Sequence, residues 1–152
     1  MAPAHLQIAL HGDAFDPIAA LAAWQHELAA RLPDPPAAES HFIGRVRGHN
    51  ADGQPLQSLE LEHYPGMTET QLEQLARDAA GNHGADAVLV HHRIGRVEPG
   101  EAIVLVAVAA DRRGPAQRCC QGLLEALKHE APFWKREWSG GAGAWVMGNT
   151  PL

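Results

Sequence analysis

The segment from Lys128 to Glu137 contains the residues whose types and spacing point most directly to chemistry. The chain has twelve Lys and Arg residues, but its only two lysines, Lys128 and Lys135, both lie here, seven positions apart. A lysine ammonium is a compact charge whose pKa falls readily on burial, whereas arginine stays protonated and spreads its charge over a planar group. Chemistry that needs a movable proton or a point charge therefore favours lysine. The spacing alone leaves open the alternative that both lysines are solvated surface residues.

Arg45 and Arg47 are a first pair of candidate partners for these lysines. They share one face of a predicted strand, because side chains alternate along a strand. Two like charges side by side favour an anion between them. The structural alternative is a solvated face, or a hairpin in which Glu60 and Glu62 face the two arginines.

Arg112 and Arg113 are a second pair, placed just before a predicted helix that begins near Pro115. Backbone N–H groups and the helix dipole favour an anion at such a position, and two arginines strengthen that preference. The alternative is a solvated pair in which Asp111 neutralises one of the charges.

The histidines and cysteines do not form a metal or redox motif. None of the ten histidines lies in an HExxH or CxxC…H arrangement, and His91 and His92 point to opposite faces of a predicted strand. Cys119 and Cys120 are adjacent, which disfavours a disulfide between them. We expect both thiols to be reduced, with at least one on the buried side of a helix.

Length and charge limit the class of protein. A chain of 152 residues is long enough for one domain with its own core. The net charge of -6 argues against general nucleic-acid binding, which depends on a basic surface. We expect no signal peptide, no membrane span and a cytoplasmic location, because no stretch is sufficiently long and apolar.

Hydrophobic periodicity predicts an α+β domain with the order β-α-β-β-α-β-β-α-β. The second helix is expected to begin with a capping box of Thr68 and Gln71 and to end at Gly81. The strand 102–110 is nearly all apolar, so we expect it to be central and covered on both faces. The other predicted elements are strands 4–10, 40–47, 56–64 and 87–93, a first helix from Pro17 to Leu32 with Asp16 as its N-cap, and a last helix from Pro115 that Pro132 breaks.

Four stretches together resemble the large, catalytic subunit of molybdopterin synthase. They keep the family's order and approximate spacing over roughly residues 42–146, and two of them, LEHYPGMTE and APFWKRE, are nearly verbatim. The stretches are Gly44–Asn50, Leu61–Glu69, His92–Gly95 with Pro99–Glu101, and Lys128–Glu137.

The resemblance implies an α/β-hammerhead-type single domain with a mixed/antiparallel sheet and three main helices. Residues 1–38 would form an N-terminal strand, helix and Pro-rich linker, and residues 39–147 the family core. The family forms a homodimer that binds two small ubiquitin-like sulfur-carrier subunits, giving a heterotetramer. It transfers sulfur from the carrier's C-terminal Gly-Gly thiocarboxylate to cyclic pyranopterin monophosphate, forming the dithiolene of molybdopterin. No cofactor, metal, nucleic acid or membrane is implied.

The resemblance also assigns site residues. Lys128 and Lys135 are the implied catalytic residues, Lys128 being nearest the chemistry and Lys135 second, more as a substrate anchor. The Arg112–Arg113 pair would act across the dimer interface. The full set of implied substrate-binding residues is Arg45, Val46, Arg47, Arg112, Arg113, Lys128, Lys135, Arg136 and Glu137.

One departure from the family's pattern bears on function. The family often has His-Arg where this chain has Arg112-Arg113, so any proton transfer by that histidine is absent here. This leaves room for an alternative of another class, a non-catalytic module that binds a carrier tail or a phosphate ligand. An inactive relative kept as a dimer partner is a third possibility, which the intact lysine pair disfavours.

Overall fold

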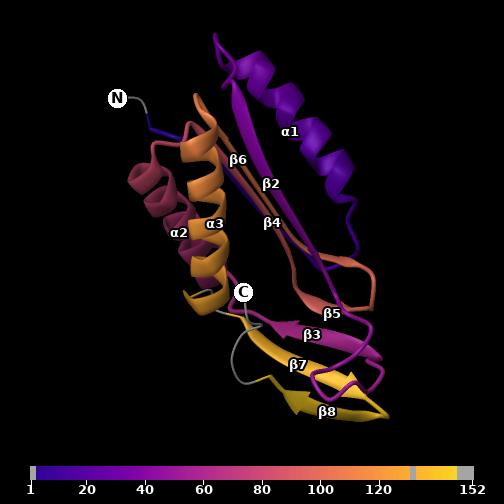
Figure 1. Ribbon diagram of the computed structural model, residues 1–152. Helices are drawn as coiled ribbons and strands as arrows, with labels where there is room; N and C mark the ends of the chain where they lie inside the picture. Colours follow the sequence, from indigo (N-terminus) through magenta and orange to yellow (C-terminus); the bar gives the residue numbers. More distant parts are fainter. Residues whose placement is uncertain (1–2, 131–132, 147–152) are drawn as a thin grey trace.

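Two four-stranded sheets form the framework of the protein (Figure 1). The computed structural model describes residues 3–130 and 133–146. The first sheet has the order β1-β4-β6-β2, with β1 parallel to β4 and the other pairs antiparallel. The second has the order β5-β3-β7-β8 and is antiparallel throughout. The strands are β1 (His5–His11), β2 (Ala38–Arg45), β3 (Ser58–Glu62), β4 (Ala87–Arg93), β5 (Gly95–Val97), β6 (Ala102–Ala110), β7 (Trp134–Ser139) and β8 (Ala142–Trp145).

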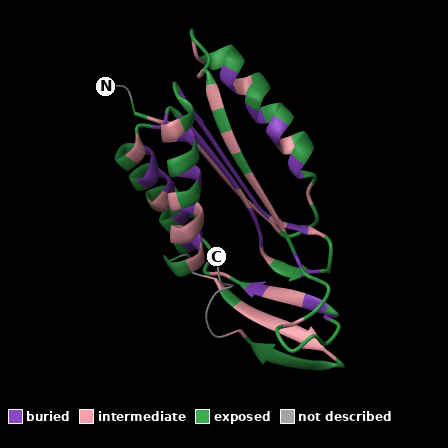
Figure 2. Cartoon of the chain, viewed as in Figure 1, coloured by how far each residue is buried: buried purple, intermediate pink, exposed green. Residues whose placement is uncertain are grey.

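Helices cover both faces of the first sheet, with α1 on one side and α2 and α3 on the other (Figure 1). The alternation of β4 separates its side chains between these two layers. Val88 and Val90 pack with α2 and α3, whereas Leu89 packs with Trp24 and Leu28 of α1. The predicted central position of strand 102–110 is confirmed, because β6 lies between β4 and β2 and is almost entirely buried (Figure 2). The helices are α1 (Pro17–Arg31), α2 (Met67–His83) and α3 (Arg113–Glu130).

The ends of α2 differ from the sequence prediction at both termini. The N-cap is Gly66, whose backbone N–H donates to Glu69, while the buried Thr68 hydroxyl accepts a bond from Tyr64. The predicted capping box of Thr68 and Gln71 is therefore wrong. The helix also continues past Gly81 to Gly84, which adopts the left-handed conformation (φ 69°) that ends a helix without steric cost. The Asp16 cap and Pro17 start of α1 are confirmed.

The alternative of a hairpin between the Arg45/Arg47 strand and the Glu60/Glu62 strand is excluded. β2 pairs with β6 in the first sheet, and β3 pairs with β5 and β7 in the second. Glu60 and Glu62 instead lie 3.7 Å from the guanidinium of Arg136 on β7. Strand partners far apart in the sequence are set by the tertiary fold, which local charge spacing does not encode.

The α+β prediction is confirmed, with differences in detail. The described residues contain eight strands where the predicted order had six, since β5 and the β7–β8 hairpin are short and half-exposed. Both thiols of Cys119 and Cys120 are free and buried. The predicted break at Pro132 lies outside the described residues. Within the described part of the chain, none of the helices is long and apolar enough to cross a membrane.

Candidate functional site

A cavity of about 700 Å³ lies where the C-terminal end of α3 meets the second sheet. Its lining combines apolar side chains from β2, β6 and α3 with a group of charged ones. Most of the charged residues that the sequence singled out come together here. They are Arg45 at the end of β2, Arg47 just after it, Lys128 in the last turn of α3, and Lys135 and Glu137 on β7. His129, which the sequence did not single out, also lines the cavity.

The two lysines reach the cavity from different elements. Lys128 is half-buried beside Leu127, which belongs to the buried stripe of α3. Lys135 is half-buried on β7, and burial, followed by the positive charge of Lys128, lowers the pKa of its ammonium. Lys128 lies in the last turn of α3, where the helix dipole is negative and attracts a cation. The lysine with the lowered pKa is therefore Lys135, the one that the sequence ranked second.

The turn after β2 fixes the two arginines at the mouth of the cavity. Val46 is buried between them, its backbone N–H donates to Glu101 and its carbonyl accepts from Gly100. Arg45 and Arg47 are exposed on either side. The backbone hydrogen bonds of Val46 thus stabilise the turn, and the guanidinium groups of Arg45 and Arg47 supply positive charge to the cavity.

Arg136 is not brought into the cavity. Neighbouring residues of β7 alternate, so Arg136 faces away from Lys135 and Glu137. Its guanidinium lies 4.0 Å from the Trp145 ring centroid and close to the two glutamates of β3. These contacts give Arg136 a structural position that links β3, β7 and β8.

Replacing Arg136 with alanine is expected to lower stability more than activity. The change removes a cation–π contact and two ion pairs, which together contribute about 1–2 kcal/mol. Chemical denaturation of wild type and variant measures this loss. Arg77→Ala is the matched control, because it removes one exposed pair with Glu73 and is expected to cost about 0.3–0.5 kcal/mol. Equal losses in the two variants contradict the structural role of Arg136.

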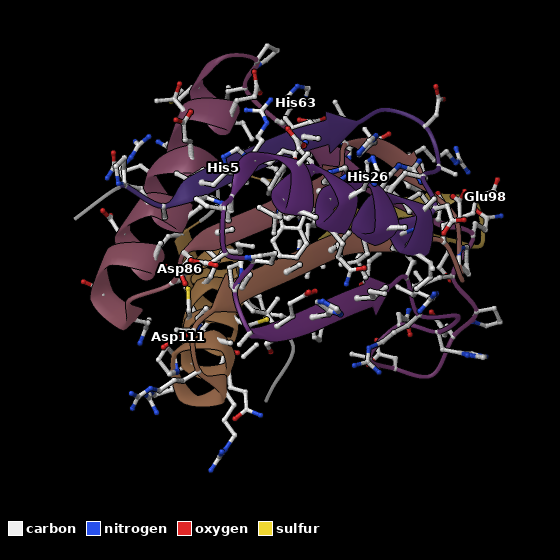
Figure 3. All side chains as sticks on the ribbon, turned by 90° about the horizontal axis from the view of Figure 1, so that it is seen from above. His5, His26, His63, Asp86, Glu98 and Asp111 are labelled. Atoms are coloured by element: carbon white, nitrogen blue, oxygen red, sulfur yellow. The ribbon has the colours of Figure 1, made fainter. Side chains whose placement is uncertain are left out.

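Arg112 and Arg113 lie far from the cavity within one chain. They line a shallow hollow at the N-terminal end of α3. Asp111, which Figure 3 labels, precedes them in the chain and lines the same hollow. Arg112 lies 3.8 Å from Asp111, and both side chains are highly exposed. Along α3, Arg113 and Lys128 are separated by about 22 Å. A single chain therefore does not bring this pair together with the two lysines.

His92 lines the cavity, although the sequence indicated no role for it in the site beyond the rejected metal pair with His91. Its ring is 7% exposed and stacks on Phe133 with ring centroids 4.1 Å apart. Burial is the main cause that lowers its pKa to about 4, with a smaller contribution from the charge of Lys135. The expected opposite orientation of His91 is confirmed, since it contacts His11 on the other side of the sheet. Because side chains alternate along a strand, His91 and His92 had to face opposite sides of the sheet. That alternation is the sequence signal that could have directed one of the two rings to this site. Across residues 3–130 and 133–146, no group of three potential metal ligands occurs.

Acid is expected to destabilise the protein through its buried histidines. Burial lowers the pKa of His92, and of His91, to about 4, against about 6.5 in the unfolded chain. Between these values the unfolded chain binds more protons, so the free energy of unfolding falls as the pH is lowered through this window. For His92 the loss by pH 4 is on the order of 2–3 kcal/mol. Denaturation from pH 7 to 4.5 measures it. The His92→Asn variant is expected to have a shallower slope, and parallel slopes contradict the assignment.

Comparison with known proteins places these features in a family. A sequence model described as "MoaE protein" matches residues 18–130. The chain belongs to the MoaE protein family. The match includes Arg45, Arg47, His92 and Lys128 and ends before β7, which contributes Lys135.

Relatives in the MoaE family are similar in sequence and in structure. The molybdopterin synthase catalytic subunit of Ralstonia nicotianae is 45% identical over 109 residues, which are 72% of this chain and 61% of that protein. The chain thus spans about three fifths of that relative's length. The MoaE protein of Burkholderia ambifaria, described as a molybdopterin biosynthesis protein, has a TM-score of 0.71 and 40% identity, covering 94% of this chain and 88% of that one.

A third relative is known as a complex. The structure of subunits 1 and 2 of the molybdopterin-converting factor from Helicobacter pylori contains a chain similar to this MoaE family member. Its TM-score is 0.73 at 25% identity, with 93% of this chain and 89% of that chain covered.

Proposed function

We propose that this chain is the catalytic subunit of a molybdopterin synthase. It transfers sulfur from the C-terminal thiocarboxylate of a small ubiquitin-like carrier to cyclic pyranopterin monophosphate, and forms the dithiolene of molybdopterin. The observation that carries the proposal is the cavity in which Lys128, Lys135, Arg45 and Arg47 converge in a chain of the MoaE family.

The charge of the cavity suits two anionic reactants. A thiocarboxylate and a phosphate-bearing pterin repel one another, and bringing them together costs free energy that fixed cations offset. The four cations at the cavity outnumber the single lining carboxylate, Glu137, although the chain as a whole has a net charge of -6. Lys128 is assigned as the residue nearest the reacting atoms, and Lys135 as an anchor whose lowered pKa also suits proton transfer.

The second arginine pair is assigned to a neighbouring copy. Arg112 and Arg113 lie about 22 Å along α3 from Lys128, which is too far for one chain to use both ends of the helix at one substrate. A homodimer in which each copy supplies this pair to the other satisfies the geometry. Two carriers would then complete a heterotetramer, and the two-subunit Helicobacter pylori complex supports a carrier partner.

Three further assignments accompany this function. The chain works in the cytoplasm, where reduced thiols such as Cys119 and Cys120 persist. Residues 39–147 form the family core, and residues 1–38 an N-terminal extension of it. Val46 contributes to substrate binding by holding its flanking arginines in place.

Reconstitution with the two reactants tests the function. Purified protein is mixed with thiocarboxylated carrier and cyclic pyranopterin monophosphate, and the expected product is a dithiolene-bearing pterin with loss of carrier sulfur. Carrier binding without product under single-turnover conditions contradicts the enzyme and favours the non-catalytic binding module.

A further inference from the structure

The hydrogen bond of His92 fixes which of its ring nitrogens carries the proton. Nδ1 lies 2.8 Å from the backbone carbonyl oxygen of Arg93. A carbonyl oxygen only accepts hydrogen bonds, so Nδ1 carries the hydrogen and donates it. Because burial keeps the ring neutral at pH 7, Nε2 has no proton and presents a lone pair.

The surroundings hold this lone pair in place within the cavity. The ring stacks on Phe133 at an interplanar angle of 14°, and its other nitrogen is tethered to the backbone of β4. Lys135 lines the same cavity, and its positive charge contributes to the lowered pKa of the imidazole. Other lining groups whose chemistry allows them to accept a proton include His49 and His129, which are exposed, and Lys135 and Glu137, which are half-buried. Among these groups in the described part of the chain, only His92 is buried.

The proposed reaction creates a need for such a group. Once the thiocarboxylate sulfur has bonded to a carbon of the pterin, the sulfur still links the carrier's acyl carbon to the substrate as a thioester. Water must cleave that acyl–sulfur bond to release the product, and attack by water requires a base. The arginines stabilise charge but have no electron pair to accept a proton.

We propose that Nε2 of His92 is the general base that takes a proton from the water attacking this thioester. The inference rests on the proposed function. The water oxygen bonds to the acyl carbon as its proton moves to Nε2, and the carbon–sulfur bond then breaks. The imidazolium returns that proton to the departing thiolate. The remaining proton of the water leaves as the carrier's new carboxylic acid ionises, so the products are a carboxylate, a pterin thiol and one proton.

The cations around His92 are compatible with this role. The charged and titratable groups of the cavity come from three elements, and the phosphate of the bound pterin offsets part of the positive charge, since the carrier tail is a neutral thioester at this step. The arrival of that phosphate raises the basicity of the imidazole, and the positive charge of Lys135 favours rapid return of the proton. The groups are Arg45, Arg47 and His49 from β2 and its following turn, Lys128 and His129 from α3, and Lys135 and Glu137 from β7.

A single-turnover experiment tests the role of His92. The enzyme is mixed with thiocarboxylated carrier and cyclic pyranopterin monophosphate, and the reaction is quenched at set times. Mass spectrometry then measures the mass of the carrier and of any adduct. The His92→Asn amide retains a donor for the Arg93 carbonyl but no basic nitrogen. We expect thiocarboxylate to be consumed at close to the wild-type rate, while a carrier–pterin adduct accumulates and decays about 100-fold more slowly. Cleavage of the adduct by hydroxylamine identifies it as a thioester.

The matched control is His91→Asn, the adjacent residue on the opposite face of β4, which is expected to accumulate no adduct. Wild-type decay of the adduct in His92→Asn overturns the proposal, as does a folded His92→Asn variant that forms no adduct. Accumulation in Glu137→Gln alone would assign the base to Glu137. If wild-type protein leaves the thiocarboxylate intact, the proposed function itself is wrong, which is a separate result.

A measurement on the unmodified protein makes the test independent of how the variants fold. The imidazole nitrogen-15 spectrum of wild-type protein at pH 7 reports the protonation of each ring nitrogen. We expect His92 to have a protonated Nδ1 and a bare Nε2. The opposite tautomer, or a charged ring, overturns the proposal.

Discussion

Replacing Lys128 with alanine is expected to lower the rate of dithiolene formation by about 100- to 1,000-fold. This range is the loss typical of removing one group that stabilises charge developing in an acyl-transfer transition state. Lys128 lies in the last turn of α3 and is only half-buried, so its removal leaves the buried stripe of that helix intact. The rate under single-turnover conditions with saturating carrier measures the effect, and thermal unfolding checks that the fold is preserved.

Two further variants test whether activity depends on the ammonium of Lys128 itself or only on the positive charge of the protein. Lys128→Arg keeps a positive charge but replaces the compact ammonium with a planar group that does not release its proton, so we expect only partial activity. Arg77→Ala removes one cation from the exposed face of α2 and is expected to retain wild-type turnover. Wild-type turnover in Lys128→Ala would show that the amine is not at the chemistry.

Mixing two inactive variants is expected to restore activity if sites are shared between copies. The variants are Lys128→Ala and Arg113→Ala, which change the two ends of α3. In a mixed dimer, one site combines both substitutions and the other combines two native residues. Random exchange makes about half of the dimers mixed, and half of their sites are intact, so about one quarter of wild-type activity should return.

The comparison depends on letting the subunits exchange before the assay. Each variant alone, and a double variant mixed with itself, provide the baseline. If Arg113 served a site in its own chain, every mixed dimer would contain only damaged sites and no activity would return. That result would exclude the assignment of Arg112 and Arg113 to a neighbouring copy.

The features that sequence could predict are those set by local pattern. The apolar run of β6 and the cap of α1 follow from side-chain type and spacing, and both appear as expected. Both glycines near the end of α2 are plausible stops, and only the backbone conformation at Gly84 distinguishes it from Gly81. Local spacing was therefore sufficient to predict that α2 exists, but not to predict the residue at which it ends.

The parts of the site that sequence missed depend on contacts between distant strands. One alternative from the sequence placed Glu60 and Glu62 beside Arg45 and Arg47, but the pairing of β3 with β7 brings them to Arg136 instead. The sequence indicated no role for His92, because its surroundings in the cavity include Phe133 and Lys135, which lie more than forty positions later in the chain. The resemblance to a family supplied the roles of Lys128 and Lys135, whereas residue types alone made them only candidates.

The length of α3 has a consequence for how the enzyme can vary. This helix begins at Arg113 and carries Lys128 in its last turn. In the proposed dimer, its length therefore sets the distance between the chain's own catalytic centre and the centre that it completes in the partner subunit. Inserting or deleting one residue would turn one end by about 100° relative to the other and misalign both centres together. Surface loops are free to change in length, but we expect α3 to tolerate neither insertions nor deletions, because its length fixes the distance between the two centres.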